Sequence, residues 1–208
     1  MTEEDVGPTY CAIMEELKAR VDTIAEVVSA IRSPTSAQHH RHNVFLFEGL
    51  YLQLRKVCEL LSLSLLLVHH ITDKAWAKTL IKEWRSDRLL DEVSKVNPIG
   101  FPKPISSSDW RSGSNETLAE LPPVFTATDL KSLYVECGDR LHVGSLRNVL
   151  RNRTLELNQT LIREWVTKIQ VGLSSHMIVL PHICRSLLVR MEDPETKQVS
   201  CTFATILK

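Results

Sequence analysis

The chain has 208 residues, of which 43% are hydrophobic, so it can bury a sizeable core without disulfides or metals. Its 25 basic and 25 acidic residues balance, which excludes a global basic field for nucleic acid or an anionic membrane and leaves only local patches. The five cysteines form no Cys-x-x-Cys pair, and we expect reduced thiols in a cytoplasmic protein.

The first ten residues, MTEEDVGPTY, lack the hydrophobic region of a secretion signal, which also favours a cytoplasmic location. The apolar run at 60–68 is too short to span a bilayer, and Arg55, Lys56 and Glu59 interrupt any longer window. We therefore expect no membrane partner.

The segment 9–32 predicts a first helix that begins after Pro8 and ends before Ser33-Pro34. Its apolar residues follow a heptad spacing: Tyr10, Met14, Leu17, Val21, Ile24, Val28 and Ile31. The seam has two interpretations. Either the helix packs on the core of its own chain, or it pairs with a second copy in a homodimer.

A polar connection follows at 33–42, with His39, His40 and His42. Adjacent histidines can bind a transition metal, but no matching cysteine or carboxylate cluster lies nearby in the sequence. We interpret the segment as a solvated loop and predict no metal site.

The segment 43–70 predicts one long central helix with Asn43 as its N-cap. It is apolar nearly all round, and its few polar side chains gather within about 60° of one another at 3.6 residues per turn. They are Glu48, Arg55, Glu59, Ser62 and His69. On a helix that sits in a core, such a stripe must be paired or must line a site.

Shorter elements follow. Helices are expected at 73–84 and 86–96, with Trp76, Leu80, Ile81 and Trp84 on the apolar side of the first, and a Pro/Ser-rich irregular segment at 97–125. Thr126 and Asp129 form a capping box for the next helix, which carries Asp139, Arg140 and His142 near its end. A last helix is expected at 154–175.

After residue 176 the apolar period changes from 3.6 to 2, which predicts strands at 177–180, 185–191 and 198–206, the last two as a hairpin. The sequence thus predicts a mainly α protein, an up-and-down helical bundle around a long central helix with a small C-terminal antiparallel β-hairpin. We divide it into an N-terminal heptad helix (1–36), a bundle (37–175) and the C-terminal strands (176–208).

The basic stretch at 145–153 suggests a second kind of site. It contains Arg147, Arg151 and Arg153, and Arg140 lies just upstream. The four arginines either form a phosphate-binding site for nucleic acid or lie on a solvated helix face.

Candidate chemistry lies in two polar pairs, each one helical turn apart: Arg55 with Glu59, and Asp139 with His142. If the two helices pack antiparallel, the pairs converge in a groove. There an imidazole could take the 2′-OH proton of RNA, and a guanidinium could stabilise the charged transition state without a metal. The alternative is a buried salt bridge that fixes the helix register.

No dinucleotide, Walker, metalloprotease or serine-hydrolase motif is present, so we expect no cofactor. The stretches LRKVCE (54–59) and LYVECGDRLH (133–142) resemble the HEPN superfamily (higher eukaryotes and prokaryotes nucleotide-binding). The FPKPI segment (101–105) is similar to one in uncharacterised bacterial proteins. The resemblance covers 43–175.

The resemblance implies a homodimeric helical bundle of a toxin or phage-defence type, whose active members are metal-independent ribonucleases. Those members place an arginine several residues before the histidine, whereas Arg140 precedes His142 by only two. Two hypotheses therefore stay open. The first is RNA or nucleotide binding through Arg55, Glu59, Asp139 and His142, and the second is a non-catalytic interaction and assembly module.

Overall fold

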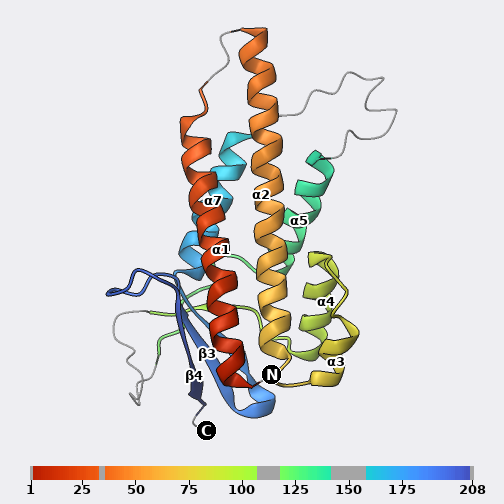
Figure 1. Ribbon diagram of the computed structural model, residues 1–208, viewed down its shortest axis with the longest axis vertical. Helices are drawn as coiled ribbons and strands as arrows, with labels where there is room; N and C mark the ends of the chain where they lie inside the picture. The colour runs from red at the N-terminus through yellow and green to blue at the C-terminus, as the bar shows by residue number, and fades with distance from the viewer. Residues whose placement is uncertain (1, 33–35, 107–117, 142–157, 207–208) are drawn as a thin grey trace.

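A computed structural model describes residues 2–32, 36–106, 118–141 and 158–206. A bundle of long helices stands above and beside a small antiparallel sheet (Figure 1). The described helices are α1 (Glu3–Ala30), α2 (Ala37–His69), α3 (Lys74–Thr79), α4 (Ser86–Val96), α5 (Ala127–Leu141) and α7 (Gln159–Leu173), with a 3₁₀ turn η1 (Pro181–Ile183). The mainly α fold class is confirmed.

The N-terminal helix is longer than its apolar period suggests. It begins at Glu3, and the carboxylate of Asp5 accepts a hydrogen bond from the Thr2 backbone N–H at 2.8 Å. Acidic side chains in this first turn also oppose the helix dipole. Pro8, which we expected at the helix start, lies inside the helix.

The heptad seam of α1 is buried in its own chain. Six of its seven positions, from Tyr10 to Val28, are at most 2% exposed, and Ile31 packs partly buried at the end. α1 packs against α2, α7 and the C-terminal strand β4 (Ser200–Thr205). The structure therefore supports packing on the core and leaves this seam no room for a second copy.

The central helix also begins earlier than expected. It starts at Ala37, so His40 and His42 lie in its first turns and not on a loop. Asn43 is therefore not an N-cap. Its buried side chain donates to the carbonyl oxygen of Arg32 at 3.0 Å and ties the start of α2 to the end of α1.

One short helix is shorter than the sequence predicts. The helix expected at 73–84 ends at Thr79, and Ile81 and Trp84, assigned to its apolar side, are exposed. Asp73 caps it as expected, accepting from the Trp76 N–H at 2.8 Å. The six residues of α3 are too few to fix a second turn by themselves.

The C-terminal strands belong to a larger sheet than a hairpin. Among the described residues the sheet has four strands in the order β1-β2-β3-β4, all antiparallel. They are β1 (Lys103–Pro104), β2 (Ser175–Leu180), β3 (Arg185–Arg190) and β4 (Ser200–Thr205). The predicted hairpin is confirmed as β3–β4, with Leu187 opposite Phe203 and Val189 opposite Cys201.

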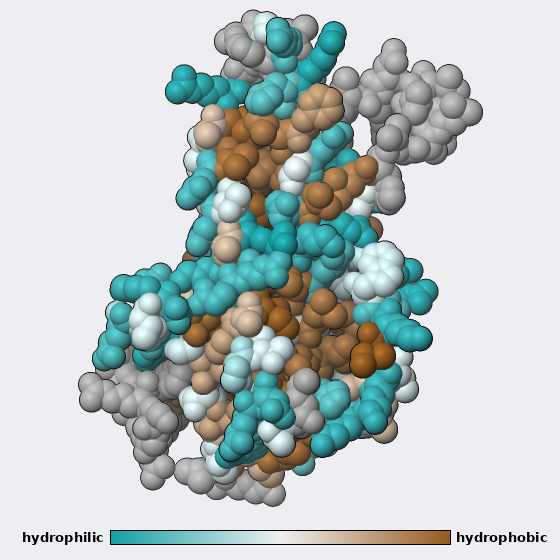
Figure 2. Space-filling model, in the orientation of Figure 1, coloured by the Kyte–Doolittle hydropathy of each residue, from teal (hydrophilic) through white to brown (hydrophobic). Residues whose placement is uncertain are grey.

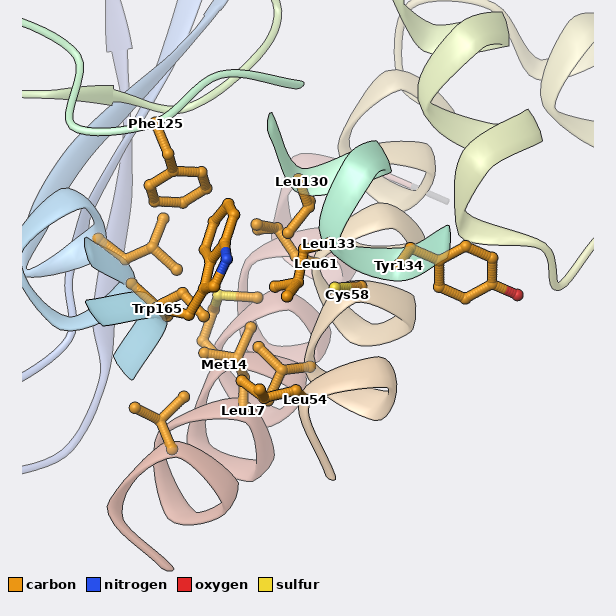
Figure 3. Packing of buried hydrophobic residues seen from close by; sticks show 14 of the residues in the cluster. Met14, Leu17, Leu54, Cys58, Leu61, Phe125, Leu130, Leu133, Tyr134 and Trp165 are labelled. Atoms are coloured by element: carbon orange, nitrogen blue, oxygen red, sulfur yellow. The ribbon is translucent and has the colours of Figure 1, made fainter. Parts of the chain in front are cut away.

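A single hydrophobic cluster joins the helices to the sheet, and its members come from all three predicted parts of the chain. Figure 3 shows Met14 and Leu17 of α1 facing Leu54 and Leu61 of α2, with Trp165 of α7 beside them. Phe125 packs edge-on against Trp165, with ring centroids 6.2 Å apart. The capping box at Thr126 and Asp129 then starts α5 beside this core.

Candidate functional site

The two helices that carry the predicted polar pairs do pack against each other and run antiparallel. Arg55 of α2 contacts Tyr134 of α5, and Tyr51, one turn earlier in α2, lies under Arg140, later in α5. The α2–α5 packing that the groove hypothesis needs is therefore present. His142 lies outside the described residues, so the proposed meeting of imidazole and guanidinium stays a prediction.

Arg55 is held on three sides. Its guanidinium carbon lies 4.0 Å from the centroid of the Tyr134 ring, and its Nη2 donates to the Tyr134 hydroxyl at 2.6 Å. Its Nε lies 3.5 Å from a carboxylate oxygen of Glu59, one turn later on the same helix. A cation over an aromatic face typically contributes about 0.5–2 kcal/mol.

The α5 backbone supplies the space for this arginine. At Gly138 a Cβ atom would lie 2.5 Å from Arg55 Nη1, closer than non-bonded atoms approach. The absent side chain leaves free the space beside α5 that Arg55 Nη1 occupies. Gly138 is therefore the residue of α5 that permits the contact, and Tyr134 is the one that receives it.

Glu59 lies between two cations. It accepts from Lys56 Nζ at 2.7 Å, so the two cations share one carboxylate. The side chain of Arg55 is 20% exposed and that of Glu59 13%. Ion pairs this close to solvent contribute about 0–1 kcal/mol each. We call Arg55, Glu59, Tyr134 and Gly138 the arginine clamp.

The remaining predicted site residues do not take part in the arginine clamp. Asp139 is exposed on α5, one residue beyond the clamp's glycine. Arg140 is ion-paired with Glu136 at 3.2 Å, which favours the solvated-face interpretation for that residue. Arg147, Arg151 and Arg153 lie outside the described residues. Within the clamp, the contact between α2 and α5 is that of Arg55 with Tyr134, and both hypotheses for the two polar pairs stay open.

The polar stripe of α2 also divides among different partners. Ser62 is buried and its hydroxyl lies 2.5 Å from that of Ser86, at the start of α4. His69 is buried too, and its Nε2 accepts from the Asn97 amide at 3.0 Å. Burial lowers the pKa of His69, which keeps its ring neutral. Arg55, Glu59, Ser62 and His69 of the stripe thus contact different partners and do not line one site.

A second polar link, missed by the sequence analysis, ties α1 to the sheet. The Tyr10 hydroxyl lies 2.9 Å from His176 Nε2, and His176 Nδ1 lies 2.8 Å from the Leu173 carbonyl oxygen. The ring therefore donates from Nδ1 and accepts from Tyr10 at Nε2. Both side chains are completely buried, and desolvation lowers the pKa of His176 to about 4.

One pocket of about 380 Å³ lies between α1, α7 and the adjoining ends of β2 and β3. Leu17, Val21 and Ile169 supply apolar walls, and Lys18 and Asp22 supply charge. The charges already have partners: Lys18 Nζ lies 3.7 Å from Glu192, and Gln170 donates to Asp22 at 3.4 Å. Among the described residues, no group of three or more histidine, cysteine or acidic side chains could hold a metal.

None of the helices in the described part of the chain combines the length and apolar character that a membrane span requires. The HEPN resemblance, which rests on residues of α2 and α5, stays a prediction. Comparison of this chain with protein-family models, with curated proteins and with solved structures finds no match.

Proposed function

We propose that this chain is a non-catalytic assembly module that works as a homodimer through the outer face of α2. One observation carries the proposal: α2 is otherwise a core helix, yet it leaves three large apolar side chains exposed on one face. Phe45 is 70% exposed, Leu52 43% and Leu63 38%. Single exposed leucines need no explanation, but an aligned series on one helix favours an interface.

The exposed residues belong to a second heptad seam, on the opposite side of α2 from the core. Alternating steps of four and three residues connect its eight positions. Seven of them lie in α2, and the eighth directly follows its last residue: Phe45, Gly49, Leu52, Lys56, Glu59, Leu63, Leu66 and His70. We call this series the outer seam.

The outer seam is complementary to itself when two copies run antiparallel. Antiparallel coiled coils place each a position opposite a d position of the other helix, and a two-fold axis near residues 57–58 satisfies this rule throughout. Leu52 then faces the partner's Leu63, and Lys56 faces the partner's Glu59. A two-fold interface must match itself in this way, because the same patch serves both subunits.

The charges and the small residue in the seam agree with this register. Lys56 and Glu59 occupy its centre, where each cation would meet a carboxylate of the other subunit. Gly49 has nothing within 4 Å of the place of a Cβ, which leaves room for the partner's Leu66. Figure 2 shows apolar areas on the upper and lower parts of the bundle with a hydrophilic belt between them.

The clamp supports the non-catalytic part of the proposal. Arg55 is the cation that the ribonuclease hypothesis needs, and its guanidinium lies against a tyrosine ring and a carboxylate of its own chain. Freeing it for a phosphate would break both contacts. RNA binding through His142 and the downstream arginines stays a prediction, and a cleavage assay distinguishes it.

The test is the mass of the protein in solution. The double variant Leu52→Glu and Leu63→Glu places like charges opposite each other at two layers, so we expect a dimer for the wild type and a monomer for the variant by light scattering. Ile81→Glu, at an exposed apolar residue outside the seam, is the matched control and should stay dimeric. A monomeric wild type, or a variant that stays dimeric, would overturn the assembly.

A charge exchange tests the register itself. Lys56→Glu alone should weaken the dimer, and adding Glu59→Lys should restore it, because the two charges then meet in reversed order. An RNase assay completes the set. Cleavage of RNA by the wild type that is lost in His142→Ala would reject the non-catalytic assignment while leaving the dimer untouched.

A further inference from the structure

Two cysteines from opposite ends of the chain meet where α1 crosses the sheet. Cys11 lies in α1 and Cys201 in β4, and their sulfur atoms are 3.1 Å apart. The pair connects residues 190 positions apart in the sequence. Neither the assembly face nor the arginine clamp uses it.

The surroundings allow the two sulfur atoms to come closer. A disulfide needs a separation of about 2.0 Å, so closure asks for a movement of only about 1 Å. On one side Cys201 lies against Gly7, where a Cβ atom would stand 3.5 Å from its sulfur.

Both thiols are half-buried, so a small oxidant can reach them while the packing keeps them together. The other cysteines differ in ways that provide controls. Cys58 is fully buried, and burial raises its pKa well above the usual range. Cys184 is exposed, and among the described residues no hydrogen bond joins its sulfur to another thiol.

Hydrogen bonding between the two thiols makes one of them the better nucleophile. The Cys11 thiol donates to the Cys201 sulfur at 3.1 Å, and the Cys201 thiol donates to the Gly7 carbonyl oxygen at 3.4 Å. The hydrogen bond with Cys201 lowers the pKa of Cys11, while burial and Glu15 oppose this shift. The same interaction raises the pKa of Cys201. Cys11 is therefore the first to react and Cys201 the resolving thiol.

We propose that Cys11 and Cys201 form an oxidation site at which a peroxide joins α1 to β4 by a disulfide. The Cys11 thiolate attacks one peroxide oxygen, the O–O bond breaks, and Cys11 becomes a sulfenic acid while the other oxygen leaves as water after protonation. The Cys201 sulfur then attacks the Cys11 sulfur. The S–S bond forms, the S–O bond breaks and a second water leaves, so two thiols are oxidised and one peroxide is reduced.

The bond would join the N-terminal helix to the edge strand of the described sheet. β4 is the last strand in the described sheet order, and its contacts outside the sheet include those with α1. An ion pair between Glu3 and Arg185, at 2.6 Å, already ties the start of α1 to β3. The disulfide would add a covalent bond between α1 and β4 to this ion pair and reduce the opening of the sheet edge.

The test uses the full chain and hydrogen peroxide in slight excess, with the products read by intact mass and peptide mapping. We expect the mass to fall by two hydrogen atoms and one cross-linked peptide pair to contain Cys11 and Cys201. A thiol reductant should reverse the change. A disulfide through Cys184, or oxygen added to Cys11 with Cys201 still a free thiol, would overturn the proposal.

Variants separate the site from general damage. Cys201→Ser should leave Cys11 as a stable sulfenic acid that a dimedone probe labels, whereas Cys184→Ser should form the disulfide like the wild type. Circular dichroism of each variant verifies its fold. A folded Cys201→Ser variant whose Cys11 is labelled no more than Cys184 would also reject the assignment of Cys11 as the reacting thiol.

Discussion

The arginine clamp and the Tyr10–His176 link both connect two elements of the fold, the clamp with charged side chains and the link with neutral ones. Each holds two distant elements together through polar atoms, α2 with α5 in the clamp and α1 with β2 in the link. The clamp keeps its charges and leaves Arg55 partly open to water. The link lies completely buried and carries no charge at neutral pH, because burial holds the pKa of His176 at about 4.

The difference shows how position decides the form of a polar contact. A charge near solvent retains much of its hydration, so the clamp gains little and loses little when it is altered. A buried neutral hydrogen bond gains little net free energy, but leaving one partner unsatisfied costs about 1–3 kcal/mol. The link should therefore be the more sensitive of the two to mutation and to pH.

The clamp and the link should differ most in how acid changes their contribution to stability. The folded-state pKa of His176 is about 4 against about 6.5 when unfolded, so between these values the unfolded chain binds more protons and stability falls as the pH falls. The loss attributable to His176 between pH 7 and 4.5 should be about 2–3 kcal/mol. Urea unfolding at the two pH values measures it.

His69 has a lowered pKa as well and contributes in the same direction, so a matched variant is needed. His176→Gln keeps groups that can accept from Tyr10 and donate to Leu173, but it does not titrate in this range. Its stability should fall less between pH 7 and 4.5 than that of the wild type. Equal losses in the two proteins would mean that the buried ring accepts a proton without opening the fold.

Removing one hydroxyl from each contact should have the second largest effect. Tyr10→Phe leaves the Nε2 of a buried histidine without its donor, and we expect a loss of about 2 kcal/mol. Tyr134→Phe makes the same chemical change in the clamp. It should cost about 1 kcal/mol or less, because Arg55 is partly exposed and water can replace the hydroxyl.

The measurement is the free energy of unfolding from chemical denaturation, with both variants compared at pH 7. Figure 3 shows the hydroxyl of Tyr134 pointing away from the buried cluster, whereas Tyr10 is completely buried. If Tyr134→Phe proved as costly as Tyr10→Phe, the clamp would have to be regarded as a buried contact.

The sequence predicts those parts of the fold that local patterns determine. The heptad spacing of α1 and the capping box at Thr126 each depend on residues close together in the chain, and the structure contains both. The hairpin register follows from the alternation of apolar residues on β3 and β4. The two-residue β1 has no such pattern, because its pairing depends on β2, far along the chain.

The same distinction applies to the polar contacts. Arg55 and Glu59 lie one turn apart, so their pairing could be predicted from spacing alone. Tyr134 lies on the buried side of α5, and nothing local in the sequence indicates that a cation covers its ring. Tyr10 and His176 are 166 residues apart, and no periodicity relates them.

Removing the cation itself should have a smaller effect than acid or Tyr10→Phe. Arg55→Met keeps the apolar stem of the side chain but loses the contact with the Tyr134 ring and the pairing with Glu59. Lys56 still neutralises Glu59, so we expect a loss of about 1 kcal/mol. High salt should narrow the gap between variant and wild type, because it screens the wild-type ion pair. A gap that widens with salt would argue against an electrostatic clamp.

The smallest effect is also the most specific, because its sign should depend on Arg55. In the wild type, Gly138→Ala puts a methyl group 2.5 Å from Arg55 Nη1, so the guanidinium must move off the tyrosine ring. Against that loss stands the helix propensity of alanine, which exceeds that of glycine by about 0.8–1 kcal/mol in a helix interior. The two terms nearly cancel, and we expect a change within about 0.5 kcal/mol.

In the Arg55→Met background the guanidinium is gone, and the flexible methionine can turn away from the new methyl group. Gly138→Ala should then stabilise the protein by about 0.5–1 kcal/mol, since only the propensity term remains. The difference between the two backgrounds is the coupling free energy between Arg55 and Gly138. A coupling of zero would mean that the glycine serves the backbone of α5 alone, and the clamp would then consist of the tyrosine and the carboxylate without it.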